Sequence, residues 1–238
     1  MQVDPATPLT AVGKKGYPLE SAGEIIPTLM PLGDSGILLR FADRLDLNAN
    51  AAAIDYARRL QSRPIPGVIE IVPNLASVLV RYDPRRIGYA VLSGELRLID
   101  SNTPDGAQIN SHEINVAYGG EDGPDIVAVA GELGMTVPTF IAAHQARLLK
   151  ILAVGFAPGF FYCGMHGADL HVPRRADVRL SVPAGSILFA ARQTAVTATP
   201  VPTGWAVIGR TQFKNFDPST NPPTRIRAGD IINFTGAP

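Results

Sequence analysis

Arginines are the residues of this chain whose type and spacing most directly suggest chemistry. Arg174 and Arg175 are adjacent, Arg179 follows closely, and Arg192 and Arg210 lie further along. A guanidinium offers planar, paired N–H donors that match the oxygens of a carboxylate or a phosphate. The sequence therefore predicts an anion-binding site in this region. Surface salt bridging is an equally good interpretation, because exposed ion pairs form readily and contribute little energy.

A glycine turn and two polar side chains add hydrogen-bonding groups to the same region. Gly185 and Ser186 belong to a Val-Pro-Ala-Gly-Ser turn, and Gln193 and Thr194 follow it. The N–H groups of such a turn can hold an oxyanion, and Gln and Thr supply directional hydrogen bonds. We therefore expect these four residues to lie beside the reacting part of a ligand.

An apolar and aromatic stretch precedes this polar group and is a candidate pocket wall. It contains Phe156, Pro158 and Gly159, and Tyr162 follows shortly after. Small-molecule sites are mostly apolar walls with a few polar groups, and Trp205 is a further aromatic residue in reach of the region. We include these five residues among the predicted substrate-binding residues.

Two weaker signals involve Cys163 and the histidines around it. Cys163 is a candidate thiolate nucleophile with His166 or His171 as its base, but a cysteine that follows Phe160-Phe161-Tyr162 is more typical of a buried core. His166 and His171, with Asp169 between them, are candidate metal ligands. Their spacing is not that of a helical site, so exposed loop histidines are the better interpretation and no metal is predicted.

The segment Gly33-Asp34-Ser35-Gly36 matches the nucleophile motif of trypsin-like proteases. That family needs its histidine base upstream of the serine, whereas all four histidines of this chain lie downstream. A turn that leads into the first strand is therefore the preferred interpretation.

Composition narrows the class of protein. The chain has 238 residues, of which 46% are hydrophobic and 18% charged, and 21 Lys+Arg balance 21 Asp+Glu. The absence of net charge gives no reason to expect a nucleic-acid partner or an anionic membrane surface. A single cysteine excludes an internal disulfide framework, and the first residues carry no long apolar run. We expect a cytoplasmic protein with no membrane anchor.

The first half of the chain has the pattern of a small two-layer unit. Apolar β-rich runs predict strands at Gly36–Phe41, Gly67–Val72 and Ala76–Tyr82, and helical spacing predicts a helix at Leu47–Arg63. Asp83 as N-cap and the following proline predict a second helix that runs to Ile99. The order β-α-β-β-α indicates a ferredoxin-like α/β domain, which we place at residues 28–110 after a flexible arm at residues 1–27.

The second half combines two helices with many short strands. The polar, turn-rich stretch Asp100–Ser111 is a natural linker, and residues 111–238 form the second predicted domain. Regularly spaced short strands with little helix indicate a β-barrel or a sandwich. The expected elements are a strand at Glu113–Tyr118, helices at Pro124–Leu133 and Val137–Leu149, and strands at Ile151–Val154, Ser186–Ala191, Trp205–Ile208 and Ile231–Phe234.

Motifs dispersed along most of the chain resemble those of a known family, the B subunits of bacterial 5-oxoprolinase. The same family is also called allophanate hydrolase subunit 1 and includes the Kip-type inhibitors of a sporulation histidine kinase. The matching segments include Leu32-Gly33-Asp34-Ser35, Tyr82-Asp83-Pro84, Tyr118-Gly119-Gly120, Gly155-Phe156-Ala157-Pro158-Gly159-Phe160, Pro173-Arg174-Arg175, Val182-Pro183-Ala184-Gly185-Ser186, Gln193-Thr194, Gly204-Trp205 and Ile208-Gly209-Arg210-Thr211.

The resemblance implies an α+β chain with a small α/β domain followed by a cyclophilin-like β-barrel. It implies a subunit, inactive alone, of an ATP-dependent complex that opens 5-oxo-L-proline to glutamate. The implied partners are the A subunit of 5-oxoprolinase and a homologous barrel subunit, which is called allophanate hydrolase subunit 2 or the C subunit of 5-oxoprolinase. The complex binds the ATP, and no ATP site is assigned to this chain. Two alternatives stay open, an inhibitor of a sensor histidine kinase and a carboxyltransferase-like partner as in urea carboxylase.

For a 5-oxoprolinase, the resemblance and the residues together suggest specific roles. Arg175 or Arg210 would bind the substrate carboxylate. The side chains of Gln193 and Thr194, with the N–H groups of the Gly185 turn, would hold the lactam oxygen or its developing charge. Gln193, Thr194 and Arg210 are accordingly the predicted catalytic residues, and Arg174, Arg175, Gly185 and Ser186 join the aromatic residues as substrate-binding ones.

Overall fold

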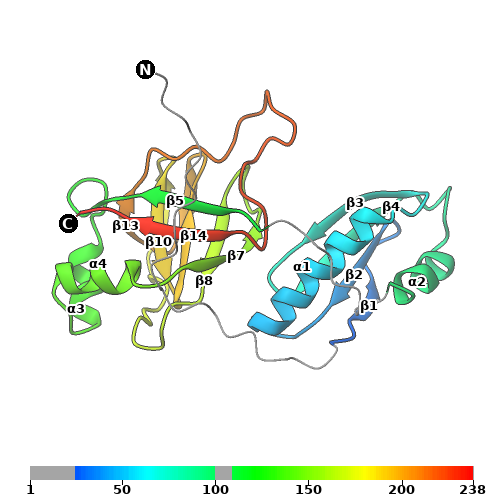
Figure 1. Cartoon of the computed structure of the whole chain (residues 1–238), viewed down its shortest axis with the longest axis horizontal. Helices are drawn as coiled ribbons and strands as arrows, with labels where there is room; N and C mark the ends of the chain where they lie inside the picture. Colours follow the sequence, from blue (N-terminus) through cyan, green and yellow to red (C-terminus); the bar gives the residue numbers. More distant parts are fainter. Residues whose placement is uncertain (1–24, 100–108, 238) are drawn as a thin grey trace, which may run out of the picture.

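The computed structural model describes residues 25–99 and 109–237 of the chain, which form two lobes side by side (Figure 1). One lobe holds a four-stranded sheet with helices α1 and α2, and the other holds an eight-stranded sheet with helices α3 and α4. The predicted mixture of α and β structure is confirmed. The finer description as ferredoxin-like and cyclophilin-like folds stays a prediction, as do the domain boundaries. The predicted arm and linker lie largely outside the described residues.

The smaller lobe is an antiparallel sheet covered on one face by a helix. Helix α1 (Leu47–Ser62) begins where the Asp46 carboxylate accepts the N–H groups of Asn48 and Ala49, at 3.0 and 2.9 Å. The apolar residues of α1 pack on the sheet and close a small core with it. The strands run in the order β1-β2-β4-β3, with bounds Thr28–Pro31 for β1, Gly36–Arg40 for β2, Val68–Pro73 for β3 and Ser77–Tyr82 for β4.

Helix α2 (Tyr89–Arg97) begins later than the sequence predicts. Asp83 does not cap it, because the Asp83 carboxylate accepts the N–H of Arg85 at 3.0 Å and the carbonyl of Asp83 accepts those of Arg86 and Ile87. These bonds close a turn ahead of the helix. Asp83 therefore accepts backbone N–H groups as predicted, but these bonds stabilise a turn of the kind that Asp side chains favour and not the start of the helix.

The larger lobe is a curved sheet that nearly closes on itself. Its strand order is β5-β14-β7-β8-β11-β10-β13-β6, and the two edge strands, β5 (Ser111–Asn115) and β6 (Ala117–Tyr118), are separated in sequence only by Val116. One continuous stretch of chain therefore forms both edges, which requires the sheet to curl around (Figure 1). The other strands are β7 (Leu149–Val154), β8 (Phe161–Gly164), β10 (Ser186–Ala190), β11 (Gln193–Val196), β13 (Ala206–Arg210) and β14 (Ile231–Thr235).

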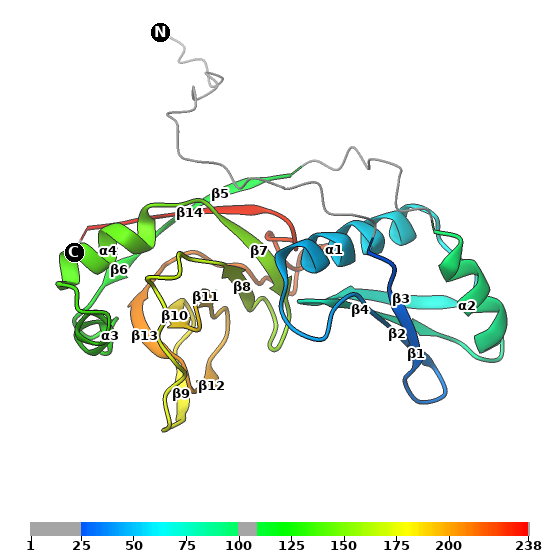
Figure 2. The same ribbon diagram turned by 90° about the horizontal axis from the view of Figure 1, so that it is seen from below.

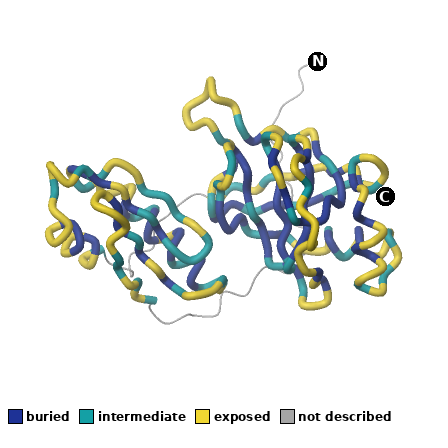
Figure 3. Tube along the Cα trace, turned by 180° about the vertical axis from the view of Figure 1, so that it is seen from behind, coloured by how far each residue is buried: buried dark blue, intermediate teal, exposed yellow. Residues whose placement is uncertain are grey.

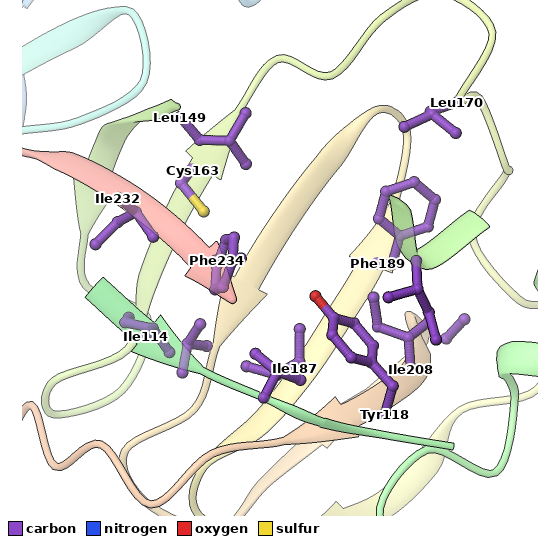
Figure 4. Packing of buried hydrophobic residues seen from close by; sticks show 14 of the residues in the cluster. Ile114, Tyr118, Leu149, Cys163, Leu170, Ile187, Phe189, Ile208, Ile232 and Phe234 are labelled. Atoms are coloured by element: carbon purple, nitrogen blue, oxygen red, sulfur yellow. The ribbon is translucent and has the colours of Figure 1, made fainter. Parts of the chain in front are cut away.

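Side chains alternate between the two faces of this sheet. The inner face carries a large apolar cluster that includes Ile187, Phe189 and Ile208 (Figure 4). Residues of α3 (Ile126–Glu132) and α4 (Val137–Gln145) also belong to this cluster. The outer face carries a second, smaller apolar cluster. The antiparallel strands β9 (Arg179–Val182) and β12 (Val201–Thr203), which form a small separate sheet, contribute to this cluster. Figure 3 shows the buried strands at the centre of this lobe and exposed residues mainly in its loops.

Helix α1 also joins the two lobes, as Figure 2 shows from below. The Asn50 side-chain amide donates to the carbonyls of Leu75 in its own lobe, at 2.9 Å, and of Leu152 in the other, at 2.8 Å. Arg58 donates to the carbonyl of Ala228 at 2.9 Å. The contact therefore uses hydrogen bonds as well as the apolar surface of Ile54, which is 2% exposed.

Several short elements were missing from the sequence-based assignment. Strands β1, β8, β9, β11 and β12 were not predicted, and the helix expected at Val137–Leu149 ends at Gln145, because Leu149 already belongs to β7. Among the described residues, no single helix is long and apolar enough to cross a membrane. Only the bent pair α3 and α4 meets that test of length and composition together.

Candidate functional site

The outer face of the eight-stranded sheet carries a continuous row of aromatic rings. The ring centroids of Phe156 and Phe160 are 5.3 Å apart, those of Phe160 and Tyr162 4.8 Å, and those of Tyr162 and Trp205 6.0 Å. The Arg174 guanidinium lies over the Trp205 ring, 5.7 Å from its centroid. Such spacings are typical of attractive aromatic and cation–π contacts. We call these five residues the aromatic face.

Arg174 has no ion-pair partner among the described residues, and its side chain is exposed. Arg192 makes no ion pair among them either, but its guanidinium donates to the carbonyl of His166 at 3.1 and 2.8 Å. Burial raises the pKa of Tyr162, and the nearby positive charge of Arg174 opposes that rise. A cation held over an indole ring, beside a phenol, is well placed to receive a carboxylate while apolar parts of the same ligand contact the rings.

A short segment holds Arg174 in this position. The N–H of Ala191 donates to the carbonyl of Val172, and the N–H of Arg175 donates to the carbonyl of Gly204, both at 2.7 Å. These two bonds fix the chain on either side of Arg174 next to the strands of the outer face. The position of the guanidinium is therefore set by backbone bonds as well as by the Trp205 ring.

Gln193 lies on the same face as Tyr162 and is nearly buried. Ala195 pairs with Tyr162 in the ladder between β11 and β8, and Gln193 is two residues before it, so both point to the outer face. Gln193 is 9% exposed, and its Oε1 is buried with no hydrogen-bond partner among the described residues. A buried amide oxygen without a donor is costly, which marks it as a candidate ligand contact.

Thr194, predicted to act beside Gln193, points to the opposite face. Its hydroxyl lies 2.9 Å from His144 Nε2 and 2.8 Å from His166 Nε2, inside the barrel, and it has no exposed surface. Adjacent residues of a strand face opposite sides, so the side chains of Gln193 and Thr194 cannot hold one ligand atom together. The prediction of a shared role for these two side chains is wrong.

Thr194 belongs to a buried polar chain that the sequence analysis missed. The phenol of Tyr118 bonds His144 Nδ1 at 2.9 Å, and the hydroxyl of Thr194 then links His144 to His166, whose ring stacks on His144 at 4.8 Å between centroids. Figure 4 shows Tyr118 beside Phe189 and Phe234 in the interior. The sequence offered only a weak indication of this chain, because Tyr118 and His144 are single polar residues in otherwise apolar segments.

Burial keeps both histidines neutral. It lowers the pKa of His166 to about 4, with a contribution from the charge of Arg147, and it lowers that of His144 well below its usual value. Cys163 is equally enclosed: it has no exposed surface, burial raises the pKa of its thiol, and the thiol donates to the carbonyl of Thr194 at 3.3 Å. The core interpretation of Cys163 therefore describes the structure, and the thiolate interpretation does not.

Arg175 and Arg179 bind a carboxylate that belongs to the chain itself. Arg175 donates to Asp125 at 2.7 Å, and Arg179 makes two bonds to the same carboxylate, which also accepts the N–H of Val207 at 2.7 Å. Burial alone would raise the pKa of Asp125, but the Arg179 hydrogen bond, the backbone bond and the two positive charges outweigh it and lower the pKa. The expectation that Arg175 is available to a substrate carboxylate is thus not met, and the salt-bridge alternative applies.

The N–H groups of the predicted oxyanion turn are also already used. Gly185 donates to the carbonyl of Thr197 at 2.8 Å, and Ser186 donates to the Thr197 hydroxyl at 3.0 Å. Gly185 has a φ of 82°, and a Cβ there would lie 2.2 Å from the carbonyl oxygen of Thr211, so its glycine serves packing. The turn is a structural element, and its donors are not directed at a ligand.

Arg210 is separated from the aromatic face. In the ladders of β10, Ser186 pairs with Arg210 at one end and Ala190 pairs with Gln193 at the other. Four residues of strand correspond to roughly 13 Å. The structure therefore brings Gln193, Tyr162 and Trp205 to one region but places Arg210 at a different one.

The remaining predicted residues lie in the loop before β8. Phe156 is 69% exposed, Pro158 is exposed, and Gly159 is buried with a φ of 70°. A Cβ at Gly159 would lie 2.6 Å from the Cβ of Phe216 and 2.8 Å from that of Ala198, so this close approach requires glycine. The loop thus presents Phe156 at the end of the aromatic face.

Two weaker candidates have clear locations. Gly33-Asp34-Ser35 forms the exposed turn between β1 and β2, which confirms the turn interpretation of that motif. The expectation of exposed loop histidines is confirmed for His171 and wrong for His166, which is 1% exposed. The described residues contain no group of three or more His, Cys, Asp or Glu side chains placed to hold a metal ion.

Comparison with known proteins identifies the family. The family described as "Carboxyltransferase domain, subdomain C and D" matches residues 27–226. The chain belongs to this family. It is 34% identical over 215 residues to the 5-oxoprolinase B subunit of Bacillus subtilis, covering 85% of this chain and 90% of that one. It is 30% identical over 204 residues to the protein of the same name from Escherichia coli O157:H7, covering 85% and 93%. The resemblance drawn from the motifs is thereby confirmed.

Solved structures place the fold among larger proteins. The crystal structure of TTHA0988 is 32% identical and superposes with a TM-score of 0.76, covering 85% of this chain, which spans only 40% of that longer one. The urea carboxylase of Kluyveromyces lactis superposes with a TM-score of 0.72 at 15% identity, covering 92% of this chain and 23% of that one. The second likeness concerns the fold alone.

Proposed function

We propose that this chain is a subunit of a 5-oxoprolinase-type hydrolase complex and that its aromatic face binds 5-oxo-L-proline. Its membership of the family and its identity to 5-oxoprolinase B subunits over most of their length support the first part. The observation that carries the second part is the unpaired Arg174 guanidinium over Trp205.

The chemistry of the substrate matches the groups on this face. 5-Oxo-L-proline carries one carboxylate, a lactam N–H, a lactam carbonyl and two ring methylenes. In the proposal Arg174 binds the carboxylate, Tyr162 and Trp205 contact the ring, and the Oε1 of Gln193 accepts the lactam N–H. Gln193 and Trp205 are 9% and 8% exposed in this structure, so both become available to a substrate only after neighbouring side chains move.

The proposed reaction needs groups beyond this chain. The lactam oxygen takes the terminal phosphoryl group of ATP, and ADP leaves. Water then adds to the activated carbon, and the ring C–N bond breaks to leave γ-glutamyl phosphate. A second water hydrolyses this acyl phosphate to glutamate and phosphate. The chain contains neither a G-x-x-x-x-G-K-[ST] loop nor a G-x-G-x-x-G motif, so we assign ATP binding to the complex and not to this chain. The proposed partners are the A subunit of 5-oxoprolinase and a homologous barrel subunit.

Reconstitution tests the proposal. The chain, purified with its two partner subunits from the native host, should convert 5-oxo-L-proline to glutamate only with ATP, and omitting this chain should abolish turnover. In the assembled complex, Arg174→Gln should raise the KM for 5-oxo-L-proline about 10-fold or more, because a charge-assisted bond contributes roughly 1.5–3 kcal/mol. Arg85→Gln, which alters an exposed arginine of the other lobe paired with Asp83, is the matched control and should change nothing. Full turnover without the chain would refute the proposal.

The family description, a carboxyltransferase domain, fits one alternative, a carboxyltransferase-like partner that acts on a urea-derived substrate. Under that alternative the same complex would leave 5-oxo-L-proline intact with ATP and would instead turn over a carboxylated urea. The inhibitor of a sensor histidine kinase stays a prediction from the resemblance; recovery of a histidine kinase as the co-purified partner would favour it.

A further inference from the structure

A small cavity with polar and apolar lining lies at the end of β10 where Arg210 is found. Its volume is about 210 Å³, and Asn115, Asp122, Arg210 and Thr211 are among its lining residues. Pockets for drug-sized ligands are usually 300–1,000 Å³, so this cavity suits a smaller molecule.

Arg210 and Asp122 form an open pair across this cavity. Their closest N···O distance is 3.8 Å, and their side chains are 40% and 44% exposed. A charge-assisted hydrogen bond is normally 2.7–2.9 Å long. By comparison, Arg175 and Asp125 of the same lobe are 2.7 Å apart and the Asp125 side chain is only 7% exposed, so that ion pair is in direct hydrogen-bond contact. Both members of the Arg210 pair therefore keep unused hydrogen-bonding capacity.

The Arg210 guanidinium is nevertheless held in place. Its Nε donates to the carbonyl of Ala184 at 3.2 Å, which leaves its terminal nitrogens to face other groups. The Thr211 hydroxyl accepts the N–H of Phe213 at 3.2 Å and still has its own hydrogen to donate. The cavity thus offers an oriented cation, a hydroxyl donor and one carboxylate.

This combination selects among ligand charges. A simple anion would be attracted by the Arg210 guanidinium but repelled by the Asp122 carboxylate. A simple cation would be attracted by Asp122 but repelled by Arg210. A molecule that carries both charges close together satisfies both side chains. We infer that this cavity binds a small zwitterionic α-amino acid, with its carboxylate on Arg210 and its ammonium group on Asp122.

Titration calorimetry on the full chain tests this inference, with L-glutamate as the probe. Glutarate is the matched analogue, because it keeps the carboxylates and lacks the ammonium group. L-Glutamate should bind saturably and glutarate at least 10-fold more weakly. Asp122→Asn and Arg210→Gln should each weaken L-glutamate binding at least 10-fold, and the exposed position of both side chains allows these variants to fold.

A control variant separates this site from general charge effects. Arg81→Gln, which alters an exposed pair with Glu70 in the other lobe, should leave L-glutamate binding unchanged. The inference is overturned if L-glutamate shows no saturable binding, if glutarate binds as well as L-glutamate, or if both cavity variants bind normally. No turnover is measured, so failure here leaves the proposed hydrolase function standing.

Discussion

At Thr194 a single hydroxyl group serves two buried histidines. The Thr194 hydroxyl can donate its hydrogen to only one of the two imidazoles, so the Nε2 of the other imidazole must carry a hydrogen and donate to the hydroxyl. The tautomer of one histidine therefore determines the tautomer of the other. Tyr118 completes the chain on the far side of His144. The interior of the barrel therefore contains a hydrogen-bonded network of neutral polar groups, and the network constrains the strand that presents Gln193 on the outer face.

Removing that hydroxyl should destabilise the protein. Thr194→Val keeps the side-chain shape but removes the partner of the Nε2 atoms of His144 and His166, and buried unsatisfied groups cost about 1–3 kcal/mol apiece. We expect a loss of roughly 2–4 kcal/mol in the free energy of unfolding, measured by urea denaturation. Thr194→Ser retains the hydroxyl and should lose only about 1 kcal/mol. A valine variant as stable as the wild type would contradict the hydrogen-bond chain.

The same histidines predict a pH dependence of stability. In the folded state the pKa of His166 is lowered to about 4, and that of His144 is lowered too, whereas both regain about 6.5 when unfolded. The unfolded chain therefore binds more protons between these values, so stability is full above pH 6.5 and falls on acidification toward pH 4. The slope should be at most about 1.4 kcal/mol per pH unit for each histidine.

Urea midpoints at pH 7 and pH 5 measure this effect. His166→Gln should reduce the difference between the two midpoints, while His171→Gln, at an exposed position, should leave it unchanged. An identical pH dependence in wild type and His166→Gln would show that this histidine does not contribute.

Among elements, the pair β9 and β12 depends on one carboxylate. Asp125, just before α3, receives Arg179 from β9, Arg175 from the preceding segment and the backbone of Val207 from β13. One side chain thus connects a helix start, the small two-stranded sheet and the large one. We call the bonds of Asp125 to Arg175, Arg179 and Val207 the Asp125 clamp. The segment before β9 carries Arg174 as well as Arg175, so the clamp also helps to position the aromatic face.

Neutralising this carboxylate should loosen the small sheet. Asp125→Asn leaves two guanidiniums that are about a third exposed without their counter-charge, and we expect a loss of roughly 2–3 kcal/mol after allowing for solvent screening. Amide hydrogen exchange should rise first in β9 and β12. Glu70→Gln, which removes a half-exposed ion pair with Arg81, should cost less than about 1 kcal/mol. Equal effects of the two variants would contradict the clamp.

The sequence predicted long, strongly patterned elements well and short buried ones poorly. Helix α1 was predicted almost to the residue, because the run of apolar positions ends at a proline. Strand β11 was not, since four buried residues, Gln-Thr-Ala-Val, show no alternation of polarity that would reveal which face each side chain takes. That omission explains why Gln193 and Thr194 were assigned one role.

The site was predictable in composition but not in pairing. The aromatic residues and Arg174 were named from the sequence, and the structure places them together. The partner of Arg175 was out of reach, because Asp125 lies 50 residues earlier and nothing local distinguishes a carboxylate that closes a clamp from one on the surface. Long-range pairing of this kind depends on the folded topology.

For the whole molecule, the two lobes meet through α1, which bonds to carbonyls on both sides. The aromatic face and the Arg210 cavity both belong to the larger lobe. Gln193 and Trp205 lie at the Ala190 end of β10, whereas Arg210 lies at its Ser186 end on β13, separated by β10 and β11 from the strand β8 that carries Tyr162. A complex that uses the aromatic face therefore leaves the other cavity accessible for a separate ligand, unless another chain of the complex covers it.

Trp205, the only tryptophan of the chain, lies on the aromatic face that we propose as the substrate-binding surface, so its signal reports on binding there. The chain labelled with 5-fluorotryptophan and assembled with unlabelled partner subunits gives a single ¹⁹F resonance. On titration with 5-oxo-L-proline this resonance should shift saturably, and Arg174→Gln should weaken the apparent affinity about 10-fold or more. A resonance that stays unchanged at concentrations that saturate turnover would contradict the claim.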